Sequence, residues 1–186
     1  MTLMRSINVL KHKGEKVHVK FDEKEQPEGQ EGDFLGSWIG VLAREFAPIT
    51  IIDWRDKSYA KVKERIWNEV KQAFDIPGWF KRKCLSSAAT SARQFRHDLS
   101  TLINKHPKGK SIYERPDIVE KYYTSITAEV WKEFVEIRLS EKFGELSKQN
   151  KGHRDQVEYL LRTGRNGYRK IDQLLVRVLT LYELFL

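Results

Sequence analysis

The fold is decided by residues 54–104, which read WRDKSYAKVKERIWNEVKQAFDIPGWFKRKCLSSAATSARQFRHDLSTLIN. The first half repeats apolar side chains at steps of three and four residues, which is the spacing of one face of an α-helix. These side chains are Tyr59, Val62, Ile66, Val70 and Phe74, with Trp67 and Ala73 widening the stripe. Ser58 precedes the stripe as a candidate N-cap, and Ile76-Pro77-Gly78 ends it. This pattern predicts a helix between Ser58 and the Pro-Gly break.

A second stripe of the same period follows the break. Its members are Cys84 or Leu85, Ala88, Ala92, Phe95, Leu99 and Leu102, and the sequence His-Pro-Lys-Gly at 106–109 closes it. The central stretch is therefore predicted to hold two helices joined by a tight turn.

The second of these helices carries a polar ridge beside its apolar stripe. At about 100° per residue, one side of the helix collects Arg82, Arg93, Arg96, Ser100 and Asn104, with His97 at its margin. Long hydrogen-bond donors on such a ridge can contact the phosphates and base edges of DNA. These six residues are the candidate DNA-binding residues. On the ridge alone, a solvated basic face without a ligand is an equally good interpretation.

Positive charge is concentrated in the same part of the chain. Residues 47–110 hold 14 Lys and Arg against 6 Asp and Glu, a net +8, which equals the formal net charge of all 186 residues. Residues 1–46 contribute 7 against 8, a net −1, and residues 111–186 contribute 13 against 12, a net +1. Such asymmetry is typical of a module that binds a polyanion, here double-stranded DNA.

The remaining sequence predicts a mainly α-helical bundle with a short β segment near the N-terminus. Val17, Val19 and Phe21 alternate with polar residues, as in a half-buried strand. Further helical patterns occur at 34–46 after Asp33, at 127–138 after Thr127, at 140–161 and at 171–185. Gly144 and Gly152 predict a bend or break in the third of these. The last is so apolar that it must dock within the chain or on a second copy.

We divide the chain into three regions on this basis. Residues 1–46 hold the β segment, an acidic loop and a short helix. Residues 47–110 form the basic helical unit, and residues 111–186 form a C-terminal helical region that supports it or mediates homo-oligomerisation.

Composition limits the location of the protein. Its single cysteine, Cys84, excludes an internal disulfide framework and fits a reducing compartment. No apolar run reaches the 18 residues typical of a membrane span, and no signal-peptide core of adequate length is visible. Together with the basic charge, these features point to the cytosol or the nucleus and to no membrane association. The predicted DNA binding selects the nucleus.

The sequence gives no positive support for catalysis. The histidines at 12, 18, 97, 106 and 153 lack zinc-ligand spacing, and one cysteine cannot complete such a site. Asp53 and Asp56 flank Trp54, but an Asp just before a helix is more typical of a cap. Cys84 lies on an apolar face and is more typical of a core residue than of a nucleophile. We therefore predict no catalytic residue, no metal site and no cofactor.

The tryptophans are expected to serve packing. Trp54, Trp67, Trp79 and Trp131 lie on or beside apolar stripes, which predicts that they anchor the core. Aromatic side chains at this spacing, on short helices with a basic last helix, resemble Myb/SANT and trihelix DNA-binding units.

Four segments of the chain, in order, resemble the plant En/Spm (Ptta) transposon-encoded proteins. They are KVHVKFDEKEQPEG at 16–29, FLGSWIGVLAREFAPITIIDWRDKSYAKVKERIWNEVKQAFDI at 34–76, RQFRHDL at 93–99, and ITAEVWKEFVEIRLSEKFGELSKQNKGHRDQVEYLLRTGRNGY at 126–168. The family's elements W-x-x-V-x-x-x-F, W-x-x-F-V-x-x-R-L-S and R-T-G-R-x-G-Y are all represented. Together the matches cover roughly residues 16–170, and their order is more specific than any single piece.

The resemblance transfers to individual positions. The matching residues are Trp54, Arg55, Trp67, Val70, Phe74, Arg93, Phe95, Arg96, Trp131, Phe134, Arg138, Asn150, Arg154, Gly164 and Gly167. The chain departs from the family at Ala92, where Trp is usual, and at Leu160-Leu161, where Pro-His is frequent. It also departs at 24–29, where the family usually reads G-Q-P-x-G.

The resemblance implies a mobile-element protein that engages DNA, as a transposase or as an accessory binder beside a separate catalytic transposase subunit. It supplies no catalytic residues. One alternative is a SANT-like interaction module for an acidic or chromatin partner. The other, from a different class, is a metal-dependent transposase.

Overall fold

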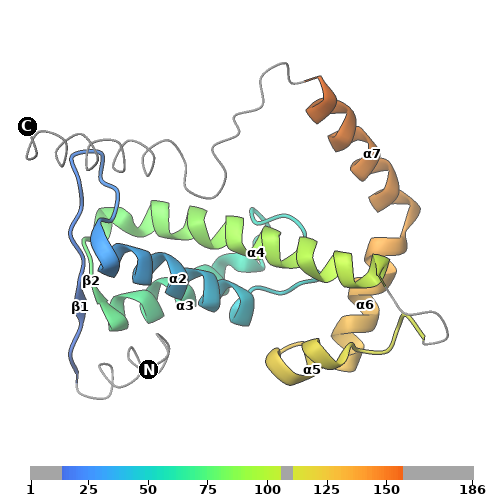
Figure 1. Ribbon diagram of the computed structural model, residues 1–186, viewed down its shortest axis with the longest axis horizontal. Helices are drawn as coiled ribbons and strands as arrows, with labels where there is room; N and C mark the ends of the chain where they lie inside the picture. The colour runs from blue at the N-terminus through green and yellow to red at the C-terminus, as the bar shows by residue number, and fades with distance from the viewer. Residues whose placement is uncertain (1–13, 106–110, 157–186) are drawn as a thin grey trace, which may run out of the picture. The chain divides into compact units, whose positions relative to one another are not determined.

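The computed structural model describes residues 14–105 and 111–156, and these are mainly α-helical with a short parallel sheet (Figure 1). The predicted fold class is therefore confirmed. The elements are β1 Val17–His18, α2 Gly29–Phe46, α3 Tyr59–Ala73, β2 Phe74–Asp75, the 3₁₀ turn η1 Gly78–Phe80, α4 Lys81–Asn104, α5 Asp117–Tyr122, α6 Ala128–Leu139 and α7 Glu141–Asp155. The chain forms two compact units, Met1–Ser140 and Glu141–Leu186. The predicted boundaries after residues 46 and 110 both fall inside the first unit.

The predicted N-terminal strand pairs with a distant segment. β1 lies parallel to β2, with Val17 opposite Phe74 and His18 opposite Asp75. His18 Nδ1 lies 3.2 Å from the Asp75 carboxylate across this pair. The partner strand is only the two residues that follow α3, which explains why no return strand was visible near residue 21 in the sequence.

The first hydrophobic core lies between α2, α3 and α4, which run side by side (Figure 1). Both predicted central helices are present, and α3 starts directly after Ser58, as its apolar stripe indicated. Asp56 orders this start, because its carboxylate accepts hydrogen bonds from the backbone N–H and the hydroxyl of Ser58. The helix predicted at 34–46 belongs to the same core and begins earlier, at Gly29. On α4, the buried residues Ala88 and Ala92 lie on the face that packs into this core.

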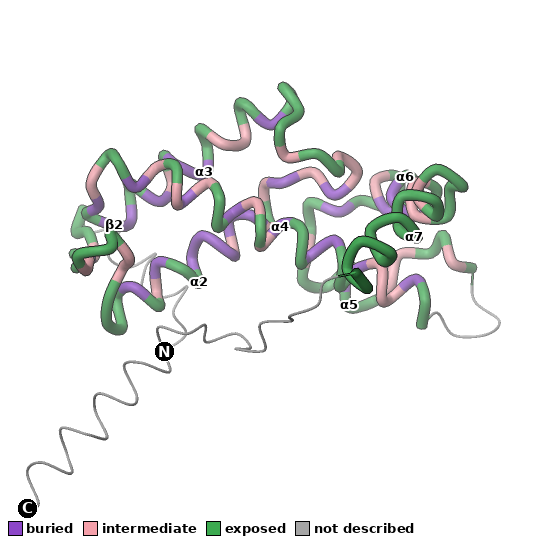
Figure 2. Tube along the Cα trace, turned by 90° about the horizontal axis from the view of Figure 1, so that it is seen from above, coloured by how far each residue is buried: buried purple, intermediate pink, exposed green. Residues whose placement is uncertain are grey.

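The second core surrounds the C-terminal half of α4. Phe95, Leu99 and Ile103 of α4 pack there with Val119 of α5 and with α6. The α6 contribution is Trp131, Phe134 and Val135, all almost fully buried. Thr127 caps α6 as predicted, because its side chain accepts a hydrogen bond from the backbone N–H of Val130. Figure 2 shows buried positions along α4 through both cores, so α4 is held along most of its length.

The second unit is described only by α7. This helix continues through Gly144 and Gly152, so the chain does not break there. None of its residues is buried. The helix predicted at 171–185, and the end of the one predicted at 140–161, lie outside the described residues.

Candidate nucleic-acid interface

The exposed side of α4 carries four of the six predicted DNA-binding residues. Arg82, Arg93, His97 and Asn104 are exposed, and we call these four residues the α4 ridge. The ridge extends over about 33 Å at ~1.5 Å per residue. Ser100 is half-buried, and its hydroxyl donates a hydrogen bond of 2.7 Å to the Arg96 carbonyl, so its donor is used within the helix.

The prediction that Arg96 belongs to the exposed DNA-binding ridge is wrong. Its side chain is buried, with 5% of its surface exposed, and points into the protein. One guanidinium N–H donates to the Tyr59 hydroxyl at 3.2 Å, and another donates to the Ile52 carbonyl at 3.3 Å. The Tyr59 hydroxyl in turn lies 3.0 Å from the Pro48 carbonyl and 2.9 Å from the Ile51 carbonyl. Arg96 therefore ties α4 to the segment between α2 and α3 and is not available to DNA.

Helical geometry explains this inward position. At about 100° per residue, Arg96 lies about 40° from the buried Ala92 and about 60° from the exposed Arg93. It stands at the margin of the apolar stripe, where acceptors on a neighbouring segment decide which way it turns. Burial raises the pKa of the Tyr59 hydroxyl, and the nearby Arg96 charge opposes that rise. Burial and the Arg96 charge together lower the pKa of Arg138, so both arginines lie in the same poorly solvated region.

Many of the cations behind the net charge of the central region are engaged within the protein. Lys81 Nζ lies 2.7 Å from the Glu64 carboxylate, and Lys83 Nζ lies 2.9 Å from that of Glu25. Three further pairs are Arg55 with Asp53, Lys63 over the ring of Trp54, and Arg65 over the ring of Phe46. The charge excess of residues 47–110 therefore overstates what is available to a ligand.

Six other cations among the described residues of this region are free. Within residues 47–105, the exposed side chains with no polar or ring partner in the described structure are Lys57, Lys61, Lys71, Arg82, Arg93 and Lys105. Arg82 and Arg93 belong to the α4 ridge. The acidic residue of α4, Asp98, lies about 140° around the helix from Arg93 and accepts a hydrogen bond from Gln94. The ridge therefore presents positive charge without a neighbouring carboxylate on its own helix.

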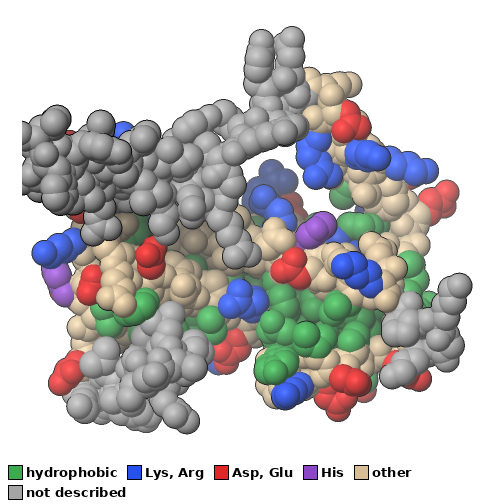
Figure 3. Space-filling view, in the orientation of Figure 1, with side chains coloured by type: hydrophobic (Ala, Val, Ile, Leu, Met, Phe, Trp, Pro, Cys, Tyr) green, Lys and Arg blue, Asp and Glu red, His purple; other side chains and the backbone are tan. Residues whose placement is uncertain are grey.

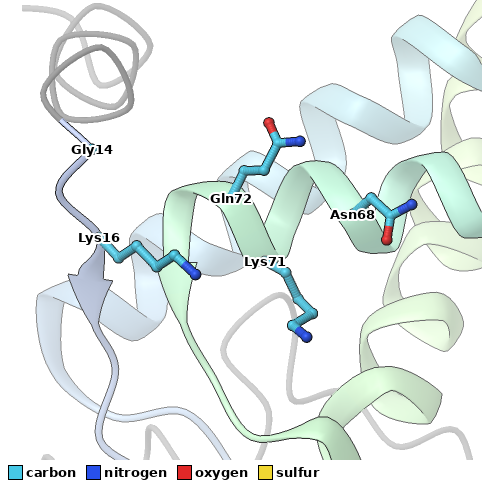
Figure 4. A pocket seen from close by; sticks show the side chains of 5 residues that line it. All are labelled: Gly14, Lys16, Asn68, Lys71 and Gln72. Carbon is cyan, nitrogen blue, oxygen red and sulfur yellow. The ribbon is translucent and has the colours of Figure 1, made fainter.

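A shallow cavity lies on the exposed side of α3 (Figure 4). Its volume is about 500 Å³, and it is lined by Gly14 and Lys16 near β1 and by Asn68, Lys71 and Gln72 of α3. Ammonium and amide groups are donors that suit a phosphate or carboxylate. The cavity is wide open and all five lining residues are exposed, so it adds a second basic surface and not an enclosed site.

The described residues offer little for catalysis. They contain no group of three or more His, Cys, Asp or Glu side chains placed to hold a metal ion. Cys84 is fully buried, and burial raises the pKa of its thiol to about 12, which disfavours the reactive thiolate. In the same ranges no helix is both long and apolar enough to cross a membrane.

We compared the chain with known proteins. It matches no protein-family model, no curated protein and no solved structure. Function is therefore inferred from the geometry described above and from the sequence resemblance.

One of the predicted packing anchors is exposed. Trp79 was predicted to be a packing anchor, but 48% of its surface is exposed. Trp67 and Trp131 are buried as expected, and Trp54 is half-buried against Tyr59. The available signal was the position of Trp79 after the Pro-Gly break, off the apolar stripe of either helix.

Apolar side chains also reach the surface elsewhere. Figure 3 shows hydrophobic groups gathered over α5, where Tyr113, Ile118 and Tyr122 are exposed. Lys121 Nζ lies 5.2 Å from the centre of the Tyr122 ring. Tyr122 is thus an exposed ring beside a lysine, as Trp79 is beside Lys83.

Proposed function

We propose that this protein binds double-stranded DNA through the α4 ridge. The observation that carries the proposal is the contrast between paired and free cations. Arg82 and Arg93 have no partner among the described residues, whereas Lys81, Lys83 and Arg96 are held by groups of the protein itself. Exposed guanidinium groups that no carboxylate of the protein pairs with are suited to bind phosphate.

The rest of the ridge fits the same ligand. His97 and Asn104 carry hydrogen-bond donors on the same side of the helix, and such groups contact phosphate oxygens or base edges. α4 packs into both hydrophobic cores, so its exposed side is a rigid support for these groups. A rigid helix loses little conformational entropy when it binds, which favours affinity.

The resemblance to plant En/Spm transposon proteins extends the proposal to a biological setting. In that setting the protein is a nuclear DNA-binding component of a mobile element, acting alone, as a homo-oligomer or beside a separate catalytic subunit. The competing proposal is an interaction module for an acidic protein surface, which would use the same cations. A third proposal, metal-dependent strand transfer, has no support from the described residues.

A substitution of Arg93 tests the proposal. Arg93→Ala removes a free cation from the ridge, and Lys132→Ala removes an exposed cation from α6 as the matched control. With a fluorescently labelled duplex, we expect Arg93→Ala to weaken binding several-fold and Lys132→Ala to leave the Kd within about twofold. Equal Kd values for the two variants would contradict a role for the ridge.

A competitor separates DNA from an acidic protein. Unlabelled duplex is expected to displace the labelled duplex at a far lower concentration of negative charge than polyglutamate does. If polyglutamate competes as well as DNA at equal charge, the protein recognises acidic polymers in general, and the interaction module is the better account.

A further inference from the structure

We propose that Trp79 is a stacking platform for an unpaired nucleobase, and that Arg82 binds the phosphate beside that base. The ligand class is DNA with a base outside the helical stack, such as a bulge, a frayed end or a single-stranded overhang. This inference rests on the proposed DNA binding by the α4 ridge and adds a second, chemically different contact to it.

The first observation is that the Trp79 ring is exposed but firmly mounted. It belongs to the 3₁₀ turn Gly78–Phe80, which leads directly into α4. Its ring centre lies 5.1 Å from that of Phe21, with the ring planes 69° apart. The Phe80 ring lies 6.1 Å away at 80°. Two edge-to-face contacts fix the orientation of an indole whose surface is 48% exposed, so little entropy is lost when a base stacks on it.

The second observation is the turn that supports this mount. Phe21 pairs with Pro27 across a short turn. Within the turn, the Asp22 carboxylate accepts the backbone N–H groups of Lys24 and Gln26. Glu25 has a φ of 58°, a left-handed backbone conformation that is uncommon for a residue with a side chain. A strained turn that is held by several hydrogen bonds is often found at functional sites.

The third observation is how the run Lys81-Arg82-Lys83 divides its roles. Lys83 Nζ is held by the carbonyl oxygens of Lys24 and Glu25 and by the Glu25 carboxylate, which uses all three of its donors. From that position it lies 5.7 Å from the centre of the Trp79 ring. Lys81 is held by Glu64. The two lysines therefore stabilise the local structure, and Arg82 is left free.

The position of Arg82 relative to Trp79 fits a nucleotide. Residues three apart in a helical turn lie on the same side, so the spacing puts Arg82 on the same side of the chain as Trp79. A flat aromatic surface beside a guanidinium group matches a base beside its phosphate, which is how proteins commonly hold unpaired nucleotides. A paired base inside the stack offers no face to the indole, so the base must be unpaired or displaced.

Nucleic acid is favoured over a protein partner because this surface continues the proposed DNA interface. Trp79 lies about 21 Å before Arg93 along the axis at ~1.5 Å per residue. That distance corresponds to about six base steps at ~3.4 Å each. Lys83, whose Nζ lies over the indole, pairs with the Glu25 carboxylate, and Lys81 pairs with that of Glu64. These two carboxylates therefore repel a phosphate less than free acids would.

The test uses the full chain and two matched DNA probes. One probe is a blunt duplex of about 20 base pairs, and the other is the same duplex with one bulged 2-aminopurine. The variants are Trp79→Ala, Trp79→Phe and Arg82→Ala, with Tyr122→Ala as control because Tyr122 is also an exposed ring beside a lysine. Anisotropy gives the Kd, and 2-aminopurine fluorescence reports stacking directly.

The expected result is a selective loss. The unaltered protein should bind the bulged probe about tenfold more tightly than the blunt probe and quench its fluorescence. Trp79→Ala should abolish both effects and leave blunt-duplex binding within about twofold. Trp79→Phe should retain part of the preference, Arg82→Ala should weaken the bulged complex without abolishing quenching, and Tyr122→Ala should match the unaltered protein.

Several outcomes would overturn the inference and leave the proposed function standing. One is normal binding of the blunt duplex without preference for the bulge or quenching by the unaltered protein. Another is an equal loss on both probes in Trp79→Phe, which keeps an aromatic ring in the mount. A third is unchanged DNA binding in Trp79→Ala together with a lower mass in sedimentation, which would make Trp79 a protein contact. Failure of the proposed function itself would appear differently, as weak binding of both probes by the unaltered protein.

Discussion

Separate substitutions of Arg96 and Arg93 should affect different properties, the first the stability of the fold and the second the affinity for DNA. The two arginines are three positions apart on α4, and both are among the residues that match the En/Spm family. Arg96 is buried and bonded to Tyr59 and Ile52, whereas Arg93 is exposed and free. We predict that Arg96→Ala destabilises the fold and that Arg93→Ala does not.

The magnitude follows from the contacts that are lost. Arg96 makes two hydrogen bonds from a charged donor, and such bonds contribute about 1.5–3 kcal/mol each to stability. Both are longer than 3 Å, which places them at the lower end of that range, and removal of the charge also relieves its repulsion with Arg138. We therefore expect a loss of about 2–4 kcal/mol in the free energy of unfolding. Exposed substitutions such as Arg93→Ala usually change it by less than about 0.5 kcal/mol.

Thermal and chemical unfolding measure this difference directly. At roughly 2–4 °C per kcal/mol for a chain of this size, the Tm of Arg96→Ala should fall by about 4–16 °C. The urea midpoint should fall with an unchanged slope. Arg93→Ala should keep the Tm within a few degrees and lose DNA affinity. A stable Arg96→Ala variant with weakened DNA binding would refute the buried position of Arg96.

Further predictions concern Cys84 and two glycines of α2. Because burial raises the pKa of the Cys84 thiol to about 12, the unfolded chain releases this proton first as pH rises. The free energy of unfolding should therefore fall above about pH 9 by up to ~1.4 kcal/mol per pH unit, and Cys84→Ala should show a correspondingly shallower fall. Gly32→Ala should cost about 1–3 kcal/mol, because the added Cβ would meet the Pro27 backbone at 2.8 Å. Gly36→Ala, where the Cβ meets nothing, should instead add about 0.5–1 kcal/mol, as urea unfolding would show.

The parts of the fold predicted from sequence are those with a strong local signal. The apolar periods of α3 and α4 and the Thr127 cap of α6 depend on neighbouring residues, so they can be read along the chain. The pairing of β1 with β2 cannot, because it joins residues 57 positions apart through two-residue strands. The break expected at Gly144 and Gly152 of α7 is absent for a different reason. Each weakens a helix by only about 1 kcal/mol, which does not force a break.

The candidate site shows the same limit. The exposure of Arg82, Arg93, His97 and Asn104 agrees with their angular positions on α4. Arg96 stands at the edge of the apolar stripe, and its direction is set by Tyr59, which is 37 residues away in the sequence. A helical wheel shows only the residues of one helix, so it cannot reveal such a tertiary contact.

The exposure of Trp79 was not predicted from the sequence, for a related reason. The apolar stripes describe the faces of helices, and Trp79 lies in the short turn between two of them. Its exposure depends on where Phe21 and the turn before α2 are placed, and that placement is again a long-range feature.

The most direct test of DNA binding by the α4 ridge is the salt dependence of the affinity for a duplex. A plot of log K against log salt concentration should fall linearly for the unaltered protein, with a slope of about −0.9 for each phosphate contacted. Arg93→Ala should make this slope shallower by about one unit, and Lys132→Ala should leave it unchanged. A slope near zero, or a slope that is identical for Arg93→Ala and the unaltered protein, would contradict the account.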